Sequence, residues 1–163
     1  EWNKYENLIK KISSVVAKYN LDLIIKRHPD MAESNFSKNF SQELPNVKIL
    51  KHAELLDLLL LSKIVIQVGL GSSIFKAQIL EKPVISVMVD HDIYGSPKSV
   101  SESCIEIKIN DFEENFSKLI SDSQSYQQVV QNANNELKEN LDNIGQSAKK
   151  IFDSLKNLKD RNS

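Results

Sequence analysis

The feature that most constrains the fold is a repeated switch between β-branched and helical patterns. Residues 65–87, "VIQVGLGSSIFKAQILEKPVISV", pass from an apolar β-branched run through a Gly-Ser turn into a helix-like segment, then into a second β-branched run. This alternation is typical of βαβ units, in which the two strands run parallel. Short, nearly continuous apolar strands indicate that helices cover both faces of the sheet.

The same alternation extends over most of the chain. An amphipathic helix opens it, with apolar residues at Tyr5, Leu8, Ile12, Val15, Val16 and Tyr19, and Asn20 can end that helix. The expected strands are 21–26, 47–50, 63–68, 84–89 and 104–109. Between them we expect a leucine-rich core helix over 53–62 and a second helix over 72–80. From Asp111 onward the pattern is helical, with a break at Gly145. The sequence therefore predicts an α/β, doubly wound, Rossmann-like parallel sheet of about five strands, with helices on both faces and C-terminal helices.

Length and charge limit the organisation and the partners. A chain of 163 residues fits one Rossmann-like domain over 1–163, with a polar tail over 156–163 that we expect to fray. The chain starts at Glu1 without a methionine, inside a helical pattern, so we expect further residues upstream of it. With 21 Lys and Arg against 22 Asp and Glu, no overall field attracts nucleic acid, and no nucleic-acid partner is expected.

The single cysteine and the apolar runs bear on the compartment. Cys104 has no second cysteine to pair with, which fits a reducing compartment such as the cytoplasm. We expect it to act as a small hydrophobe in a strand. The longest apolar run, Leu55–Leu61, contains Asp57 and is too short to span a bilayer.

The chemistry-bearing residues follow the predicted strands. In an open parallel sheet, ligands bind beyond the carboxyl ends of the strands. His28, His52 and His91 follow the first, second and fourth strands, and the Gly-Ser turn follows the third. We therefore expect all three histidines and the turn to lie on one rim of the sheet.

The turn has the residue types that a phosphate needs. Gly69 and Gly71 tolerate positive φ and a close approach of the backbone, and the first amides of the following helix lack intrahelical partners. Ser72 and Ser73 add two hydroxyl donors. The turn is neither a Walker loop nor a full Gly-x-Gly-x-x-Gly motif. Ordinary N-capping by the serines remains an equal alternative to anion binding.

Cations beside the turn complete the expected site. Lys26, Arg27 or His28, at the end of the first strand, could balance the charge of a phosphate. His91 lies between Asp90 and Asp92, which suggests a metal site, but no second His/Cys cluster at ligand spacing supports one. No metal is expected.

Two segments carry a resemblance to a known family. "IIKRHPD" and "GLGSSIFKAQILEKPVISV" resemble the C-terminal, donor-binding half of GT-B glycosyltransferases, in particular surface-polysaccharide enzymes with a His-Pro motif and a paired-serine motif. "HAELLDLLLLSKIVIQV" is similar to the helix and strand that precede the serine pair in that family, and "NIGQSAKKIFDSL" to its closing helix. The resemblance covers most of residues 21–155.

The resemblance implies roles for individual residues. His28 matches the motif histidine that contacts the donor phosphate and stabilises the leaving group, so it is the expected catalytic residue. Ser72 and Ser73 match the serines that bind the same phosphate. Related enzymes often carry an acidic residue for the ribose hydroxyls a few positions later, where this chain has Lys76. Further candidate contacts to the nucleotide or sugar are His52, Lys76, His91 and Asp92.

The resemblance also implies an activity: inverting transfer of a sugar from a nucleotide-activated donor to a hydroxyl of a glycan or lipid-linked acceptor, in surface-polysaccharide biosynthesis. The general base would come from an N-terminal domain of the same chain, so this part alone is expected to be inactive. No cofactor other than the nucleotide-sugar substrate is implied. The implied location is cytoplasmic, with the full-length protein peripheral at the inner face of the membrane.

Two alternatives stay open. UDP-sugar 2-epimerases share the fold and the "EKPV"-like return, but their Ser-Gly-Gly turn, paired glutamates and Arg-rich motif are missing here. A non-catalytic interaction module with the same fold is the other alternative, and Lys76 favours it slightly.

Overall fold

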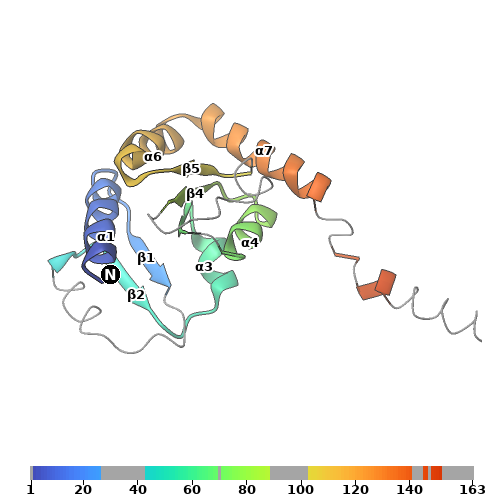
Figure 1. Ribbon diagram of the computed structural model, residues 1–163, viewed down its shortest axis with the longest axis horizontal. Coiled ribbons are helices and arrows are strands. Elements are labelled where there is room, and N and C mark those ends of the chain that lie inside the picture. The colour runs from blue at the N-terminus through green and yellow to red at the C-terminus, as the bar shows by residue number, and fades with distance from the viewer. Residues whose placement is uncertain are drawn as a thin grey trace, which may run out of the picture.

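The computed structural model describes residues 2–26, 43–69, 71–88, 103–140, 145–146 and 148–151. The described elements up to β5 are strands interspersed with helices, and helices follow (Figure 1). In chain order the elements are α1 (Trp2–Ala17), β1 (Leu23–Lys26), β2 (Val47–Leu50), α3 (Leu55–Leu61), β3 (Val65–Val68), α4 (Ser73–Ile79), β4 (Val84–Val87), β5 (Ile105–Ile107), a 3-10 turn η1 (Ile109–Asp111), α6 (Phe112–Ser121) and α7 (Ser123–Asn140).

All strand pairs in the described residues are parallel, as predicted. β1 pairs with β2, with Leu23 opposite Val47, and β3 pairs with β4, with Val65 opposite Val84. β5 adds to β4, with Ile85 opposite Ile105. The five predicted strands are present, each within its expected range, but they form a two-stranded and a three-stranded set rather than one hydrogen-bonded sheet. The α/β Rossmann-like prediction is confirmed.

One apolar core lies between the strands and the pair α1 and α6. Side chains alternate along each strand, so Ile85 and Val87 of β4 both point to this side. Phe112 stacks on Phe116, with ring centroids 5.4 Å apart. β1 and β3 contribute to the same core, which joins the two strand sets into one apolar layer. Its buried members are Leu8, Ile12, Val15, Val16, Ile85, Val87, Phe112, Phe116 and Leu119.

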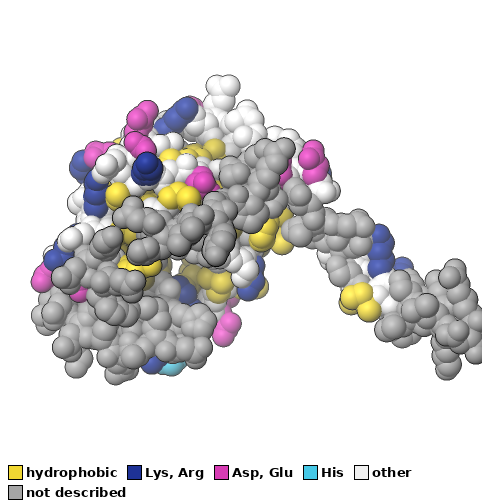
Figure 2. Space-filling view, viewed as in Figure 1, with side chains coloured by type: hydrophobic (Ala, Val, Ile, Leu, Met, Phe, Trp, Pro, Cys, Tyr) yellow, Lys and Arg dark blue, Asp and Glu magenta, His cyan; other side chains and the backbone are white. Residues whose placement is uncertain are grey.

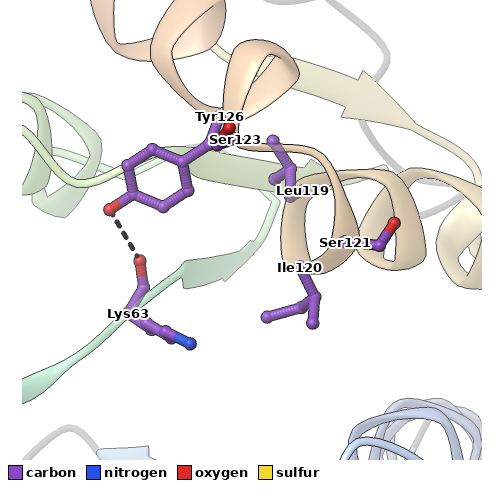
Figure 3. Close-up of a pocket in the computed structure, with 6 residues that line it drawn as sticks. All are labelled: Lys63, Leu119, Ile120, Ser121, Ser123 and Tyr126. Carbon is purple, nitrogen blue, oxygen red and sulfur yellow. Dashed lines mark hydrogen bonds between the residues drawn. The ribbon is translucent and has the colours of Figure 1, made fainter.

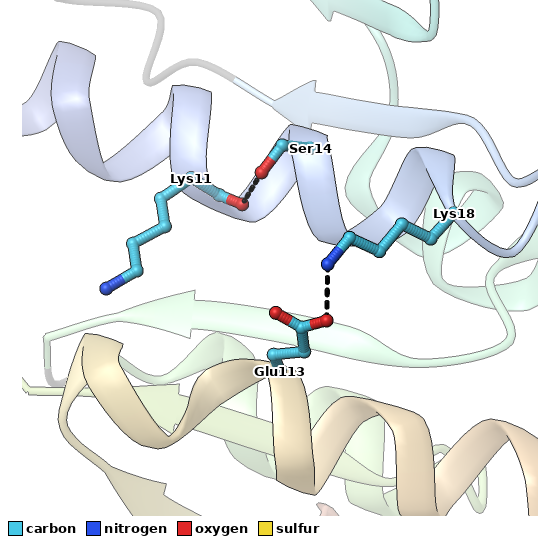
Figure 4. Close-up of polar contacts among 4 residues, drawn as sticks. All are labelled: Lys11, Ser14, Lys18 and Glu113. Carbon is cyan, nitrogen blue, oxygen red and sulfur yellow. Dashed lines mark hydrogen bonds and ion pairs between the residues drawn. The ribbon is translucent and has the colours of Figure 1, made fainter.

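Polar contacts along the exposed edge of this interface add less. Lys18 forms an ion pair with Glu113 of α6, and the Ser14 hydroxyl donates to the Lys11 carbonyl at 2.8 Å (Figure 4). The Lys11 ammonium also donates to the Asn110 side-chain oxygen at 2.7 Å. Because these groups are exposed, we attribute the cohesion of α1 and α6 to their apolar faces.

The second core lies on the opposite face, under α3 and α4. Its buried members are Leu59, Ile74, Ala77 and Val84. α7 packs against both α4 and α6 along the side of the molecule (Figure 1), and buries Val130, Ala133 and Leu137. Helices therefore cover both faces of the strand layer, as the apolar strands predicted.

The structure corrects the expectation for the leucine run. Leu59 is buried, but the exposed fractions of Leu56, Leu60 and Leu61 are 57%, 53% and 81%. Hydrophobic side chains accordingly reach the surface over α3 and α4 (Figure 2). A helix lying on one face of a sheet can bury only one side, so a continuous leucine run cannot be core on all sides. Tyr5 of α1 is also exposed, contrary to its expected place in the apolar face.

The two predicted chain breaks coincide with left-handed backbone. Asn20 follows the end of α1 with φ of 53°, and Gly145 has φ of 78° just before the helical residues 148–151. The expected fraying tail, 156–163, lies outside the described residues. In the described ranges, no helix is long and apolar enough to cross a membrane.

Candidate functional site

The turn after β3 begins with a glycine in left-handed backbone. Gly69 is buried and has φ of 69°, as the turn prediction required of a glycine here. Its N–H donates to the Val87 carbonyl of β4 at 3.0 Å. The turn is therefore fixed to the carboxyl end of the neighbouring strand, where ligands bind in parallel sheets.

The two serines after this glycine have different environments. Ser72 is exposed, has helical backbone angles and makes no capping hydrogen bond with its side chain. The Ser73 hydroxyl is half-buried and donates to the side-chain oxygen of Gln67, not to the helix backbone. The structure therefore shows neither serine acting as an ordinary N-cap.

Gln67 is the residue that the sequence analysis missed. It is the third residue of β3, and its side chain reaches forward to the turn. Its Oε1 accepts from Ser73, and its Nε2 donates to the Val68 carbonyl at 3.3 Å. A Cβ at Gly71 would lie 3.0 Å from that Nε2, so Gly71 makes room for the glutamine. The available signal was one polar residue inside the apolar run "VIQV".

The described lysines and histidine of the predicted site come from three parts of the fold. Lys26 closes β1, and its ammonium donates to the Lys51 carbonyl at 3.1 Å, just beyond the end of β2. His52 follows directly and is exposed. Lys76 is exposed in the last turn of α4, one helical turn beyond Ser73. Arg27, His28, His91 and Asp92 lie outside the described residues, so their convergence with the serines stays a prediction.

Next to β5, the thiol of Cys104 is partly shielded from water. Cys104 lies directly before β5 and packs against the core under α3 and α4, as its expected role as a small hydrophobe required. Desolvation, together with the Glu106 carboxylate two residues on, raises the pKa of the thiol to about 12. The thiol therefore stays protonated at neutral pH. Within the described ranges, no three His, Cys, Asp or Glu side chains group as a metal site would require.

A pocket of about 260 Å³ lies at the opposite edge of the strands. It is lined by Lys63, Leu119, Ile120, Ser121, Ser123 and Tyr126, and the Tyr126 hydroxyl donates to the Lys63 carbonyl at 3.2 Å (Figure 3). Desolvation raises the pKa of Tyr126. Lys63 precedes the amino end of β3, whereas the Gly-Ser turn follows its carboxyl end. The length of the strand, about 13 Å, therefore separates this pocket from the turn.

The comparisons with known proteins bear on the fold. No family model matches the chain, and no curated protein matches it. Among solved structures, it is similar to a chain of the "GtfA/B complex", with a TM-score of 0.53 at 15% identity over 78% of this chain. The match spans 30% of that chain's length. At this identity the likeness shows a shared fold: the described α/β arrangement occurs as part of a longer protein.

Proposed function

We propose that this chain is the nucleotide-sugar donor-binding part of a glycosyltransferase. One observation carries the proposal: a glycine turn at the carboxyl end of a parallel strand leaves the Ser72 hydroxyl exposed, without a capping bond. A hydroxyl and turn amides placed there suit the phosphate of a nucleotide. Because α4 has only seven residues, we assign the binding to these groups and not to its dipole.

The structural neighbour supports this proposal at the level of the fold. The GtfA/B complex is a glycosyltransferase complex, and a part of one of its chains has a fold similar to that of this chain. The sequence resemblance of the His-Pro and paired-serine segments points to the same class of enzyme. We therefore propose a GT-B-type role in surface-polysaccharide biosynthesis, with an N-terminal domain supplying the acceptor site.

In the proposed reaction, the residues of this chain stabilise the leaving group. The bond between the sugar and the donor phosphate breaks, a bond to the acceptor oxygen forms, and the acceptor proton passes to a base on the proposed N-terminal domain of the same chain. Negative charge grows on the phosphate as its bond breaks, so hydrogen-bond donors and cations there lower the barrier. We assign Ser72, His28 and the cations Lys26 and Arg27 to that task. Lys26 would exchange its bond to the Lys51 carbonyl for the phosphate.

The test is calorimetric titration of the full chain with CMP, UDP, GDP and CDP. We expect at least one nucleotide to bind, and Ser72→Ala to weaken that binding about tenfold, since a hydrogen bond to a charged group is lost. Ser14→Ala is the matched control, because Ser14 is an exposed serine of α1 whose hydroxyl bonds only within its own helix in the described contacts. Absence of binding of all four nucleotides at millimolar concentration would contradict the proposal.

The exposed leucines favour a second candidate, a non-catalytic interaction module. Leu56, Leu60 and Leu61 present apolar surface of a kind that often marks a protein contact. Stable association with a protein partner, together with no nucleotide binding, would favour this candidate. Turnover with solvent deuterium exchange into UDP-GlcNAc would instead favour the epimerase alternative.

A further inference from the structure

We propose that Gln67 is a positioning residue that gives the two serines different roles. Its hydrogen bond with Ser73 stabilises the turn, and we call this contact the brace. Ser72 is left as the serine whose hydroxyl binds the ligand. The assignment of Ser72 to a ligand rests on the proposed function. The brace itself depends only on contacts within the chain.

The hydrogen bonds of Gln67 fix the direction of its amide. Nε2 donates to the Val68 carbonyl at 3.3 Å, and Oε1 accepts from the Ser73 hydroxyl. If the amide were turned over, Oε1 would face the Val68 oxygen, and neither atom carries a proton. The observed orientation is therefore favoured, and Ser73 must be the donor in its bond to Gln67.

This direction determines what Ser73 can offer to an anion. A hydroxyl has one proton, and that of Ser73 is directed to Gln67. Its remaining lone pairs would face the lone pairs of a phosphate oxygen. Ser72, which is exposed and makes no capping bond, keeps its proton for a ligand. The pair that the sequence presents as equivalent is thus divided by one side chain of β3.

The space around Gly71 supports the role of Gln67 as a brace. A Cβ at Gly71 would meet the Gln67 amide at 3.0 Å and the Ser73 hydroxyl at 3.5 Å. The glutamine side chain therefore lies close to the backbone of Gly71. The Ile74 N–H closes the same turn by donating to the Gly71 carbonyl at 3.2 Å.

The neighbouring strand supplies a matched control. Ser86 is opposite Gln67 in the β3–β4 register and is fully buried. Its hydroxyl has no hydrogen-bond partner among the described residues. Ser86→Ala therefore removes a buried hydroxyl on the same face without breaking a bond seen here, whereas Ser73→Ala breaks the bond to Gln67.

The first experiment measures thermal unfolding of the full chain, without ligand, for Ser73→Ala, Gln67→Met and the double variant. We expect each single variant to lower Tm by about 2 to 4 °C, and the double variant to lower it no further. Ser73→Thr keeps the hydroxyl and should retain the parent Tm. Hydrogen exchange should accelerate at residues 71–74 in both single variants and stay unchanged there in Ser86→Ala. The proposed brace would be contradicted if the Tm losses of the two single variants added up in the double variant, or if hydrogen exchange at residues 71–74 did not change in the single variants.

The second experiment measures affinity for inorganic pyrophosphate. We expect Ser72→Ala to lose about tenfold in affinity with no change in Tm. Ser73→Ala and Gln67→Met should lose affinity by one common factor, about fivefold, that does not multiply in the double variant, and Ser73→Thr should restore it. Equal affinity loss in Ser72→Ala and Ser73→Ala, with no coupling to Gln67, would overturn the division of roles. If the parent binds neither pyrophosphate nor any nucleotide, the proposed function and the ligand role of Ser72 fail together, while the unfolding data still decide the brace.

Discussion

The two faces of the strand layer differ in what they bury. On the face under α1 and α6, β4 contributes Ile85 and Val87, and aromatic rings fill the interior. On the face under α3 and α4, the same strand contributes Val84 and the hydroxyl of Ser86, and Gln67 lies beside them in register. The first face is mainly apolar, although Ser13 of α1 is also buried and its hydroxyl donates to the Asn46 side-chain oxygen at 2.9 Å. The second face has polar groups where further apolar contacts could have formed, and the candidate turn adjoins it.

The largest expected effect tests the apolar face. Phe112 is fully buried and stacks on Phe116, so Phe112→Ala should lower the free energy of unfolding by about 3 to 5 kcal/mol. Urea unfolding followed by circular dichroism measures this loss. Leu61→Ala is the control on the other face, because Leu61 is 81% exposed and should change stability by less than about 0.5 kcal/mol. Similar losses in both variants would contradict the division between the faces.

The next effect tests the polar face. Gln78 of α4 is buried, and its Nε2 donates to the Ser103 carbonyl and hydroxyl, both at 2.8 Å. Gln78→Leu removes this donor from both oxygens in a buried setting, and we expect it to cost about 2 kcal/mol in urea unfolding. Gln128 is on the exposed side of α7, and its side-chain amide donates a hydrogen bond to the Asn132 side-chain oxygen. Gln128→Leu removes this hydrogen bond and should cost under about 0.5 kcal/mol. If the Gln78 variant were as stable as the parent, the polar contacts of this face would not support the fold.

Some features of the two faces could be predicted from the sequence, and others could not. The run "VISV" predicts a buried strand because three of its four side chains are apolar and β-branched, and all four residues of β4 are buried. The direction of Gln67 could not be predicted, because it depends on where α4 places Ser73 after the turn. Likewise, the leucine run gives no sign of which leucines face solvent until α3 is placed on the strands. Local patterns determined the elements, and tertiary packing determined the site.

A third prediction concerns pH and the thiol on the polar face. The pKa of Cys104 is raised from 9.0 to about 12, so the folded state keeps its proton where the unfolded state loses it. This contribution to stability is fully present below pH 9 and is lost as the pH rises toward 12. We expect the free energy of unfolding to fall in this window by about 1 kcal/mol per pH unit, under the one-proton limit of about 1.4, because water reaches part of the side chain.

Cys104→Ala is the control for the pH effect. Relative to this variant, the parent should lose stability progressively above pH 9, and both should have parallel profiles below it. Alkylation by iodoacetamide at mildly alkaline pH should also be at least about tenfold slower in the folded parent than in urea, because only the thiolate reacts. Equal alkylation rates in the two states would show that the thiol is not protected.

The smallest effect tests whether charges contribute to the apolar face. Lys18 and Glu113 bridge α1 and α6 at the surface, with both side chains more than half exposed. Glu113→Gln should therefore lower the free energy of unfolding by only about 0.2 to 1 kcal/mol, and this loss should vanish near 1 M salt, where the screening length is about 3 Å. Urea unfolding at low and high salt measures both values. A loss of unfolding free energy close to that of Phe112→Ala, or one that persists in high salt, would contradict this prediction. It would mean that the ion pair, and not the aromatic interior, joins α1 and α6, so that the first face would depend on charge as well as on apolar contact.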